Sequence, residues 1–252
     1  MLIAHISDTH ILASQSGHVS ADLRADCLRR CVEDINNRQP DAVIFTGDTV
    51  QVGQADEYER LRVLLGPLKP PLYLVPGNRD DQHILRGVFK GCAQLFESPE
   101  FCHYVVDEHE VRLIGLDSTL SGERKGVFCR KRQAWLDAAL SARPSCPTLL
   151  FIHHPPFDVD DHYVNGYRRH DEATALANIV MRHQQVRGLV CGHVHWPVDC
   201  WWVDRPARIT PSVAIDLRKG IDEKDAANRP IYMIHNLSRV EGIASQMILV
   251  ST

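Results

Sequence analysis

Short apolar runs, each ending in a polar motif, alternate with amphipathic segments along most of this chain. The run Ala42–Phe45 is apolar at every position, as expected for a strand buried on both faces. In Ser20–Arg38 an apolar residue recurs every four positions from Leu23 to Ile35, which predicts a helix with Ser20 as its cap. This alternation predicts an α/β fold built on a largely parallel sheet.

Apolar runs bounded by turn residues predict twelve strands, and the strand-rich last third predicts a second sheet or an antiparallel extension. The predicted strands are Leu2–Ser7, Asp41–Thr46, Leu72–Val75, His103–Val106, Val111–Leu116, Thr148–Ile152, Leu189–Cys191, Val198–Val203, Ala207–Ile209, Val213–Leu217, Pro230–His235 and Gln246–Val250. The predicted helices are Ser20–Arg38, Ala55–Leu65, Gln82–Phe89, Arg130–Ala142 and Glu172–His183, the last capped by Asp171.

Length and charge limit the classes of function. The 252 residues fit one large domain, residues 1–252, with a sizeable core. The net charge is −4, whereas a protein that holds nucleic acid mainly by charge should be basic. We therefore expect no stable nucleic-acid partner, and a small anionic substrate drawn by local metal charge instead.

The chain carries no signal for secretion or for membrane insertion. Met1 leads directly into an apolar strand, and no stretch approaches the roughly 20 apolar residues of a membrane span. The eight cysteines are scattered without a Cys-x-x-Cys motif, which is typical of reduced thiols. We expect a cytoplasmic protein without a membrane partner.

Five motifs at predicted strand ends carry side chains that bind metals. A carboxylate and an imidazole at alternate positions of an extended chain share one face, as in Asp8-x-His10, and can hold one ion. A carboxylate such as Asp48 can bridge two ions, bringing them to roughly 3.5–4 Å apart. The motifs are Asp8-Thr9-His10, Gly47-Asp48, Gly77-Asn78-Arg79-Asp80, His153-His154-Pro155-Pro156 and Gly192-His193-Val194-His195.

Each motif alone also has an ordinary explanation. Gly-Asp and Gly-Asn are turn signals, and His-His-Pro-Pro suits a strand leading into a loop. The full set, in this order and at buried strand ends, is hard to produce by chance. It predicts two adjacent metal ions, a site that usually hydrolyses phosphate esters.

These motifs resemble the calcineurin-like metallophosphoesterase superfamily, whose pattern is Asp-x-His, Gly-Asp, Gly-Asn-His, His and Gly-His-x-His. The resemblance runs from Leu2 to His195, and the His153-His154-Pro155-Pro156 block is similar to class III cyclic nucleotide phosphodiesterases and glycerophosphodiesterases. It implies a four-layer α/β/β/α sandwich of two mixed β-sheets flanked by helices. In relatives, the part equivalent to residues 205–252 builds lids or oligomer contacts, so a homo-oligomer is one expectation.

The resemblance also implies the ligand sets and the reaction. Asp8, His10, Asp48 and His195 would hold one ion, and Asp48, Asn78, His153 and His193 the other. Iron and manganese are the foremost ions, with zinc, cobalt and magnesium as alternatives. A hydroxide held by the metal pair would attack phosphorus in line. His153 is preferred over His154 because the family's ligand stands two residues before proline; His154 would then face the substrate or support the ligands.

One position departs from the family pattern, because Arg79 stands where the family has histidine. Arginine can grip a phosphate with two parallel hydrogen bonds, but it cannot donate a proton near neutral pH. We therefore expect Asn78, Arg79 and Asp48 to serve the reaction, with protonation of the leaving group either weakened or passed to another group. Asp80 would orient a histidine or stabilise the loop, and an alternative role for Arg79 is to neutralise Asp80 or Asp81.

The predicted activity is hydrolysis of a small phosphodiester, with a cyclic nucleotide of the 3′,5′ or 2′,3′ form as the leading substrate. A glycerophosphodiester comes next, and a phosphomonoester is a further alternative. The polar and aromatic segment Phe157–His170 is either a loop facing the substrate or an ordinary solvated loop. The contrasting hypothesis is a binding or scaffold protein on the same fold, which would be expected to lack ligand residues.

Overall fold

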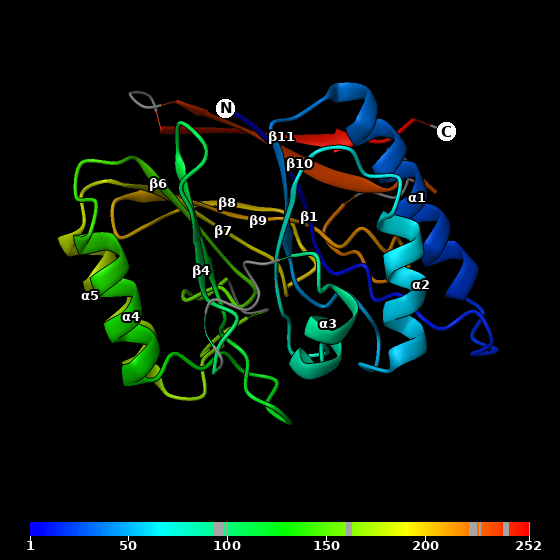
Figure 1. Cartoon of the computed structure of the whole chain (residues 1–252), viewed down its shortest axis with the longest axis horizontal. Coiled ribbons are helices and arrows are strands. Elements are labelled where there is room, and N and C mark those ends of the chain that lie inside the picture. Colours follow the sequence, from blue (N-terminus) through cyan, green and yellow to red (C-terminus); the bar gives the residue numbers. More distant parts are fainter. Residues whose placement is uncertain are drawn as a thin grey trace.

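Two β-sheets lie between two pairs of helices in the computed structural model of the chain (Figure 1). The structure describes residues 1–92, 98, 100–159, 163–221, 226, 228–238 and 242–251. Within these residues the first sheet has five strands and the second has six. Helices α1 and α2 lie outside the first sheet, and α4 and α5 lie outside the second (Figure 1). This order of layers confirms the predicted sandwich of two mixed sheets flanked by helices.

The first sheet is parallel at its centre and antiparallel at one side. Strands β1, β2 and β3 run parallel, while β10 pairs antiparallel with both β1 and β11. The order across the sheet is β11 (Gly242–Leu249), β10 (Ile231–Ser238), β1 (Leu2–Ile6), β2 (Ala42–Thr46) and β3 (Leu72–Val75).

The second sheet repeats this mixed character. Strands β5, β6, β7 and β9 run parallel, and the antiparallel strands β4 and β8 form its two edges. The order is β4 (Tyr104–Val106), β5 (Arg112–Leu116), β6 (Thr148–Ile152), β7 (Val186–Cys191), β9 (Arg205–Ile209) and β8 (Val198–Trp202). Because β9, β10 and β11 are strands of the two sheets, residues 205–252 contribute directly to both of them.

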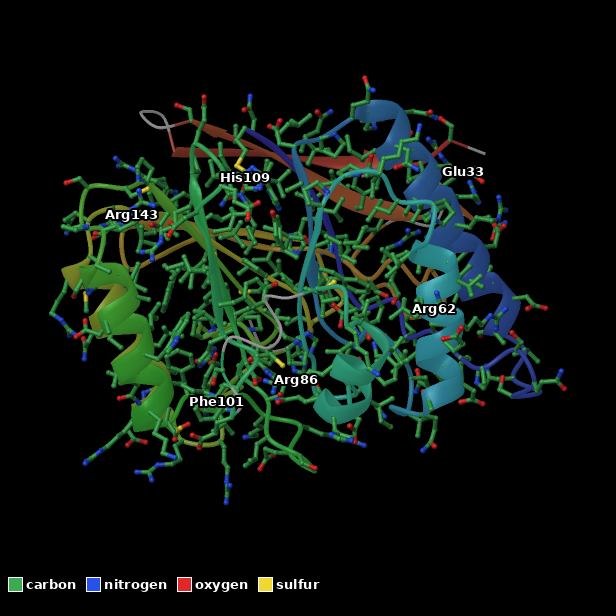
Figure 2. The ribbon with its side chains drawn as sticks, in the orientation of Figure 1. Glu33, Arg62, Arg86, Phe101, His109 and Arg143 are labelled. Atoms are coloured by element: carbon green, nitrogen blue, oxygen red, sulfur yellow. The ribbon has the colours of Figure 1, made fainter. Side chains whose placement is uncertain are left out.

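The helices pack by their apolar faces and expose their charged faces. They are α1 (Ala21–Arg38), α2 (Ala55–Leu65), α3 (Gln82–Val88), α4 (Arg130–Ser141) and α5 (His170–Arg182). Cys27, Leu28 and Cys31 of α1 are buried against the first sheet, whereas Glu33 of α1 and Arg62 of α2 are exposed (Figure 2). Such one-sided burial is the reason that the four-residue periodicity predicted α1 correctly.

The second core lies between α4, α5 and the second sheet. Leu136 and Leu140 of α4 and Leu176 of α5 are fully buried there, together with Leu150 and Ile152 of β6. Among the described residues, no helix is long and apolar enough to cross a membrane.

Three local predictions were wrong. Val213–Leu217 forms bends and a turn rather than a strand, and only Val213 and Ala214 of it are buried. Ser20 precedes α1 but makes no capping hydrogen bond, because its own backbone is close to helical (φ −88°, ψ 0°). Helix α5 starts at His170, so Asp171 lies inside its first turn, where it pairs with Arg169 at 3.0 Å rather than capping the helix.

Candidate metal centre

The loops that follow β1, β2, β3, β6 and β7 meet between the two sheets. In parallel strands these loops all leave from the same edge, where open α/β sheets place their sites. Each loop carries one or two of the side chains predicted as ligands. They are Asp8 and His10 after β1, Asp48 after β2, Asn78 after β3, His153 after β6, and His193 and His195 after β7.

The backbone turns sharply at five of these residues. Positive φ angles occur at Asp8 (53°), His10 (46°), Asp48 (46°), His193 (71°) and His195 (64°). Non-glycine residues adopt this left-handed conformation rarely, and it concentrates at functional sites. The expected reason for the pairing of Asp8 with His10, alternation along an extended strand, was therefore wrong, because β1 ends at Ile6 and both residues lie in the turn beyond it.

The first group of converging atoms consists of two carboxylates and two imidazoles. Nε2 of His10 lies 3.1 Å from Nε2 of His195, and 3.6 Å from Oδ2 of Asp48. Oδ1 of Asp8 lies 3.3 Å from Nε2 of His195. Their ligand atoms lie within 4.8 Å of one another, as the donors around a single ion would.

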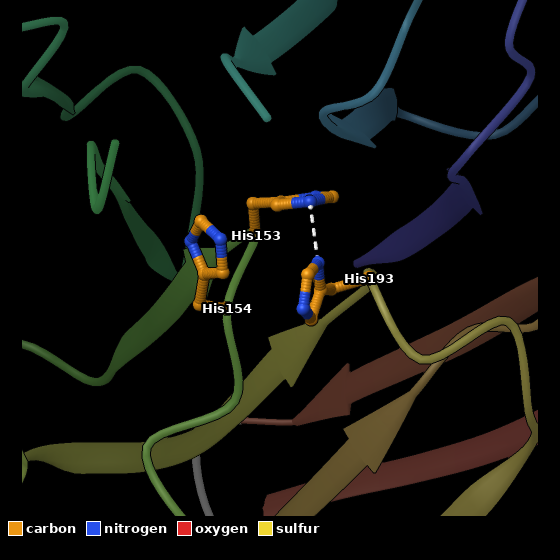
Figure 3. Close-up of side chains that lie close together, drawn as sticks. All are labelled: His153, His154 and His193. Carbon is orange, nitrogen blue, oxygen red and sulfur yellow. Dashed lines mark hydrogen bonds between the residues drawn. The ribbon is translucent and has the colours of Figure 1, made fainter. Parts of the chain in front are cut away.

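The second group shares Asp48 with the first. Nε2 of His153 lies 3.1 Å from Nδ1 of His193 (Figure 3), 3.2 Å from Oδ1 of Asn78 and 3.5 Å from Oδ1 of Asp48. Oδ1 of Asp48 thus faces this group while Oδ2 faces His10. The two oxygens of a single carboxylate connect the two groups of donors.

A ring nitrogen of His154 also lies within 4.8 Å of those of His153 and His193, but both ring nitrogens of His154 have protein partners. Nε2 lies 3.1 Å from the carbonyl oxygen of Arg124, to which it donates, and Nδ1 lies 2.8 Å from Oγ of Ser118. In His153, by contrast, Nδ1 donates a hydrogen bond to the carbonyl oxygen of Thr46 at 2.6 Å. Nε2 is then left facing Asp48 and Asn78. This geometry favours His153 over His154 as the ligand.

Backbone carbonyls also orient His195. Its Nδ1 lies 3.1 Å from the carbonyl oxygen of Leu217, so that Nε2 is left for the cluster. Ligand histidines commonly donate their second ring nitrogen in this way. The sequence prediction missed Leu217 because the apolar alternation of Val213–Leu217 predicts a strand. It also missed Thr46, whose backbone oxygen carries no sequence signal.

Burial sets the protonation of the cluster. Burial lowers the pKa of His10 and of His193 to about 3, so both imidazoles are neutral and can offer a nitrogen lone pair to a metal ion. Burial likewise raises the pKa of Asp48, to about 7, with further increases from Asp8 and Asp80. For Asp8, burial also favours a higher pKa, but His195 and the neighbouring imidazoles hold the pKa below its ordinary value.

The donor set fits metal ions. Oδ1 of Asp8 and Nδ1 of His10 are buried without a hydrogen-bond partner among the described residues. A buried carboxylate oxygen without a partner is costly unless a cation meets it. In addition, imidazole nitrogens 3.1 Å apart, as in His10 and His195, match adjacent ligands of an ion with metal–nitrogen bonds near 2.1 Å. Carboxylate, amide and imidazole donors suit manganese, iron and zinc.

Asp80 holds the two ligand loops together. It accepts hydrogen bonds from the backbone nitrogens of Gly77 (2.8 Å) and Thr49 (3.2 Å), and from the hydroxyl of Tyr58 (3.1 Å). The loops also approach closely, since a Cβ at Gly77 would lie 2.1 Å from the backbone nitrogen of Asp48. Of the two predicted roles for Asp80, the described contacts match stabilisation of the loop.

A cavity of about 370 Å³ opens above the cluster. Its lining includes His10, Asp48, Asn78, His193 and His195, the cations Arg79, Arg124 and Lys125, and the segment Tyr163–Gly166. A larger groove of about 1050 Å³ shares Asn78 and Arg79 with it. Part of the segment Phe157–His170 therefore lines the cavity; its Asp160, Asp161 and His162 lie outside the described residues.

Arg79 is exposed at the junction of the cavity and the groove. Within the described part of the chain its guanidinium has no carboxylate within 4.0 Å, so neutralisation of Asp80 or Asp81 is not observed. His154, by contrast, is fully buried and does not line the cavity. Its predicted contact with substrate stays a prediction, and its hydrogen bonds favour a positioning role.

Comparison with known proteins shows which family this chain resembles. Residues 1–197 match the calcineurin-like phosphoesterases. A probable glycerophosphodiester phosphodiesterase GpdQ of Arcobacter nitrofigilis is 31% identical over 252 residues, covering 97% of this chain and 92% of that protein. A 3′,5′-cyclic adenosine monophosphate phosphodiesterase CpdA of Vibrio vulnificus is 28% identical over 223 residues, covering 88% and 79%.

The fold agrees with this assignment. A dimetal phosphatase from Danio rerio superposes with a TM-score of 0.74, over 100% of this chain and 99% of that one, at 15% identity. At such a low identity, the superposition supports a shared fold and nothing about function. The family match extends over most of the chain and includes every motif from Asp8 to His195, so the protein belongs to the calcineurin-like phosphoesterase family.

Proposed function

We propose that this protein is a phosphodiesterase that uses two metal ions to hydrolyse a small phosphodiester. The observation that carries the proposal is the position of Asp48, whose two carboxylate oxygens face two separate groups of histidine nitrogens 3.5 and 3.6 Å away. Paired ions joined by a carboxylate are the usual arrangement for in-line displacement at phosphorus.

In this proposal Asp8, His10, Asp48 and His195 hold one ion, and Asp48, Asn78, His153 and His193 hold the other. Iron and manganese are the foremost choices, and zinc, cobalt and magnesium remain alternatives. Bound there, the two ions would lower the pKa of water and neutralise the phosphate oxygens.

The protein side chains then bind and orient the diester. Arg79 grips the phosphate with paired hydrogen bonds from the rim of the cavity, while the amide of Asn78 contacts it from the floor. Asp80 keeps the loop of Asn78 in place through Gly77. His154, bonded to Ser118 and Arg124, fixes the loops around the second group of ligands.

We propose a cyclic nucleotide as the first substrate to test and a glycerophosphodiester as the second. The cations Arg79, Arg124 and Lys125 around the cavity suit an anionic ligand of either kind. Relatives carry both names, since GpdQ is named for a glycerophosphodiester and CpdA for a cyclic nucleotide. A phosphomonoesterase and a metal-binding scaffold protein are the remaining alternatives.

We also propose that the protein is cytoplasmic, acts without a nucleic-acid or membrane partner, and is a candidate homo-oligomer through residues 205–252. Size-exclusion chromatography with light scattering tests the oligomer. A mass equal to one 28.5 kDa chain would rule it out.

The deciding experiment removes metal, restores it with manganese or with iron and zinc, and measures hydrolysis of a panel of esters. The panel holds 3′,5′- and 2′,3′-cyclic nucleotides, glycerophosphodiesters, an aryl diester and an aryl monoester. Turnover of one diester class that depends on added metal is the expected result. Bound metal without turnover of any diester would favour the scaffold protein.

A further inference from the structure

Three polar side chains are fully buried in the strands of the first sheet. His5 lies in β1, Thr46 in β2 and His235 in β10, and each is 0% exposed among apolar neighbours such as Ile3 and Ile44. Buried polar groups cost stability unless they are hydrogen-bonded, and aliphatic residues would suit these strands as well. Burial of three polar side chains in these strands therefore calls for hydrogen-bond partners or a functional role.

The inner contacts run from His5 to the metal cluster. Nε2 of His5 lies 2.8 Å from Oγ1 of Thr46, whose hydroxyl donates to Oγ of Ser7 at 2.8 Å. The Ser7 hydroxyl donates to Oδ2 of Asp8 at 2.6 Å. Three consecutive hydrogen bonds therefore connect a histidine inside the sheet to a carboxylate of the first ligand group.

The outer contacts continue across the sheet. Nε2 of His235 lies 3.0 Å from Nδ1 of His5, and Nδ1 of His235 lies 2.8 Å from Oγ of Ser245 in β11. The hydroxyl of Thr210 lies 2.6 Å from the same Nδ1 of His5. The complete path crosses β11, β10, β1 and β2, four adjacent strands of the first sheet.

Proton counting gives the path one direction. Asp8 accepts the single hydroxyl proton of Ser7, so Thr46 must donate to Ser7, and His5 must donate to Thr46 through Nε2. Nδ1 of His5 is then an acceptor, and its single lone pair is shared by Nε2 of His235 at 3.0 Å and the Thr210 hydroxyl at 2.6 Å. Burial keeps the pKa of His5 well below its ordinary value, and burial lowers the pKa of His235 to about 3, so both rings are neutral as this assignment requires.

The path determines which oxygen of Asp8 is free. Oδ2 accepts from Ser7 and from the backbone nitrogen of His193 at 2.9 Å. Oδ1 has no hydrogen-bond partner in the described part of the chain and lies 3.3 Å from Nε2 of His195. A carboxylate fixed through one oxygen presents the other to an ion without reorienting.

We infer that His235, His5, Thr46 and Ser7 form a positioning relay, which holds Asp8 through Oδ2 and thereby sets the affinity of the first metal position. The four residues touch neither substrate nor ion; they act through Asp8. Hydrogen bonds that all point the same way polarise one another, so a break in the middle weakens the last bond to Asp8. The inference rests on the proposed metal site.

The test compares Thr46→Val, which keeps the shape but removes the hydroxyl, with Thr46→Ser, which keeps the hydroxyl. Thr148→Val is the matched control, since Thr148 is equally buried and its hydroxyl donates to the carbonyl of Cys146 at 2.9 Å, outside the relay. The readouts are the Mn²⁺ dissociation constant by titration calorimetry and the melting temperature of the metal-free protein.

We expect Thr46→Val to weaken Mn²⁺ binding about tenfold, the loss typical of groups that support metal ligands. Thr46→Ser and Thr148→Val should bind as the unaltered protein does, although Thr148→Val melts at a lower temperature. The relay is refuted if Thr46→Val binds Mn²⁺ normally, or if Thr148→Val loses as much affinity as Thr46→Val.

Ser7→Ala supplies a second and smaller change in case Thr46→Val does not fold. It removes the hydrogen bond to Asp8 directly, and we again expect about a tenfold loss of Mn²⁺ affinity. Normal affinity of Ser7→Ala would refute the relay on its own. If the unaltered protein bound no Mn²⁺, iron or zinc, the proposed function and the relay would both fail. Normal Mn²⁺ binding by the unaltered protein and by Ser7→Ala would refute the relay alone, so the two failures are distinguishable.

Discussion

A metal centre of this kind depends on which nitrogen each histidine presents. His153 and His154 are adjacent in the chain, yet the carbonyls of Thr46 and Arg124 bind opposite ring nitrogens, Nδ1 in His153 and Nε2 in His154. Residue types alone cannot distinguish them, because both are histidines at the end of the same strand. The carbonyls that decide the matter belong to residues far away in the sequence.

The two histidines should therefore respond differently to the same substitution. We expect His153→Gln to lower diester kcat/KM and Mn²⁺ affinity at least about 100-fold, since the proposed ligand of the second ion is lost. His154→Gln should cost less than about tenfold, because only a supporting contact changes. Calorimetry with Mn²⁺ and steady-state kinetics measure both effects. The reverse ranking would make His154 the ligand.

Arg79 should leave a signature in the choice of substrate. A guanidinium binds phosphate but does not protonate a leaving group, whereas histidine can do both near neutral pH. Arg79→His should therefore raise the rate for a poor alkyl leaving group relative to an aryl one by about tenfold, a modest share of what general acids contribute. An unchanged ratio of the two rates would remove Arg79 from leaving-group chemistry.

At the scale of elements, strands that end in clear turn signals were predicted well and supporting loops were not. Strand β3 matches its prediction, Leu72–Val75, because Pro76 and Gly77 end it. Val213–Leu217 has the alternation of a strand, yet it turns beneath the cluster, where the nitrogen of Val213 donates to the carbonyl of Ser7. Val213 and Ala214 are buried and Ile215 is partly buried by tertiary packing, which a local pattern cannot distinguish from a strand.

The close approach of two loops gives a prediction at the same scale. Gly77→Ala would place a Cβ 2.1 Å from the nitrogen and 2.3 Å from Oδ1 of Asp48, so the loops after β2 and β3 must separate. We expect a loss of about 1–3 kcal/mol in the free energy of unfolding, as for other overpacked sites. The displacement of Asp48 should also lower diester hydrolysis at least about 100-fold, since the shared ligand moves.

Gly87→Ala is the control, because its Cβ would meet no atom within 4 Å in α3. It should keep full activity and gain roughly 0.5–1 kcal/mol from helix propensity. Urea unfolding and kinetics measure both variants. Normal activity in Gly77→Ala would mean that the loops tolerate separation.

For the whole molecule, the sequence was sufficient to predict the layers but not the links between distant strands. The alternation of apolar runs and helices predicted a largely parallel sheet with a second sheet or an antiparallel extension, and the family resemblance implied the two sheets flanked by helices. The contact of His5 with His235 could not be predicted, because it depends on the pairing of β1 with β10, more than 200 residues later. Local patterns identify strands, while such pairings follow from global packing.

Buried neutral histidines should make the metal-free protein sensitive to acid. Burial lowers the pKa of His103 to about 4, whereas the unfolded chain titrates near its ordinary value of 6.5. Between these values the unfolded state binds more protons, so stability is full above about pH 6.5 and falls as the pH drops toward 4. The loss is at most about 1.4 kcal/mol per pH unit for this one group.

Urea unfolding between about pH 7 and pH 5 tests this dependence. The free energy of unfolding should fall less steeply with acid in His103→Gln than in the unaltered protein, because one buried titrating group is gone. Equal slopes would show that His103 takes no part.

The position of β10 late in the chain has a consequence for folding during synthesis. The first ligand motif follows the end of strand β1, but one of the two neighbours of β1 in the sheet, β10, is synthesised more than 200 residues later. Pairing between segments so distant in sequence is slow to form. Until β10 arrives, His5 lacks His235 and β1 has an open edge. A nascent chain should therefore bind its ions only after β10 has been made, and a messenger truncated before residue 231 should yield an aggregation-prone product.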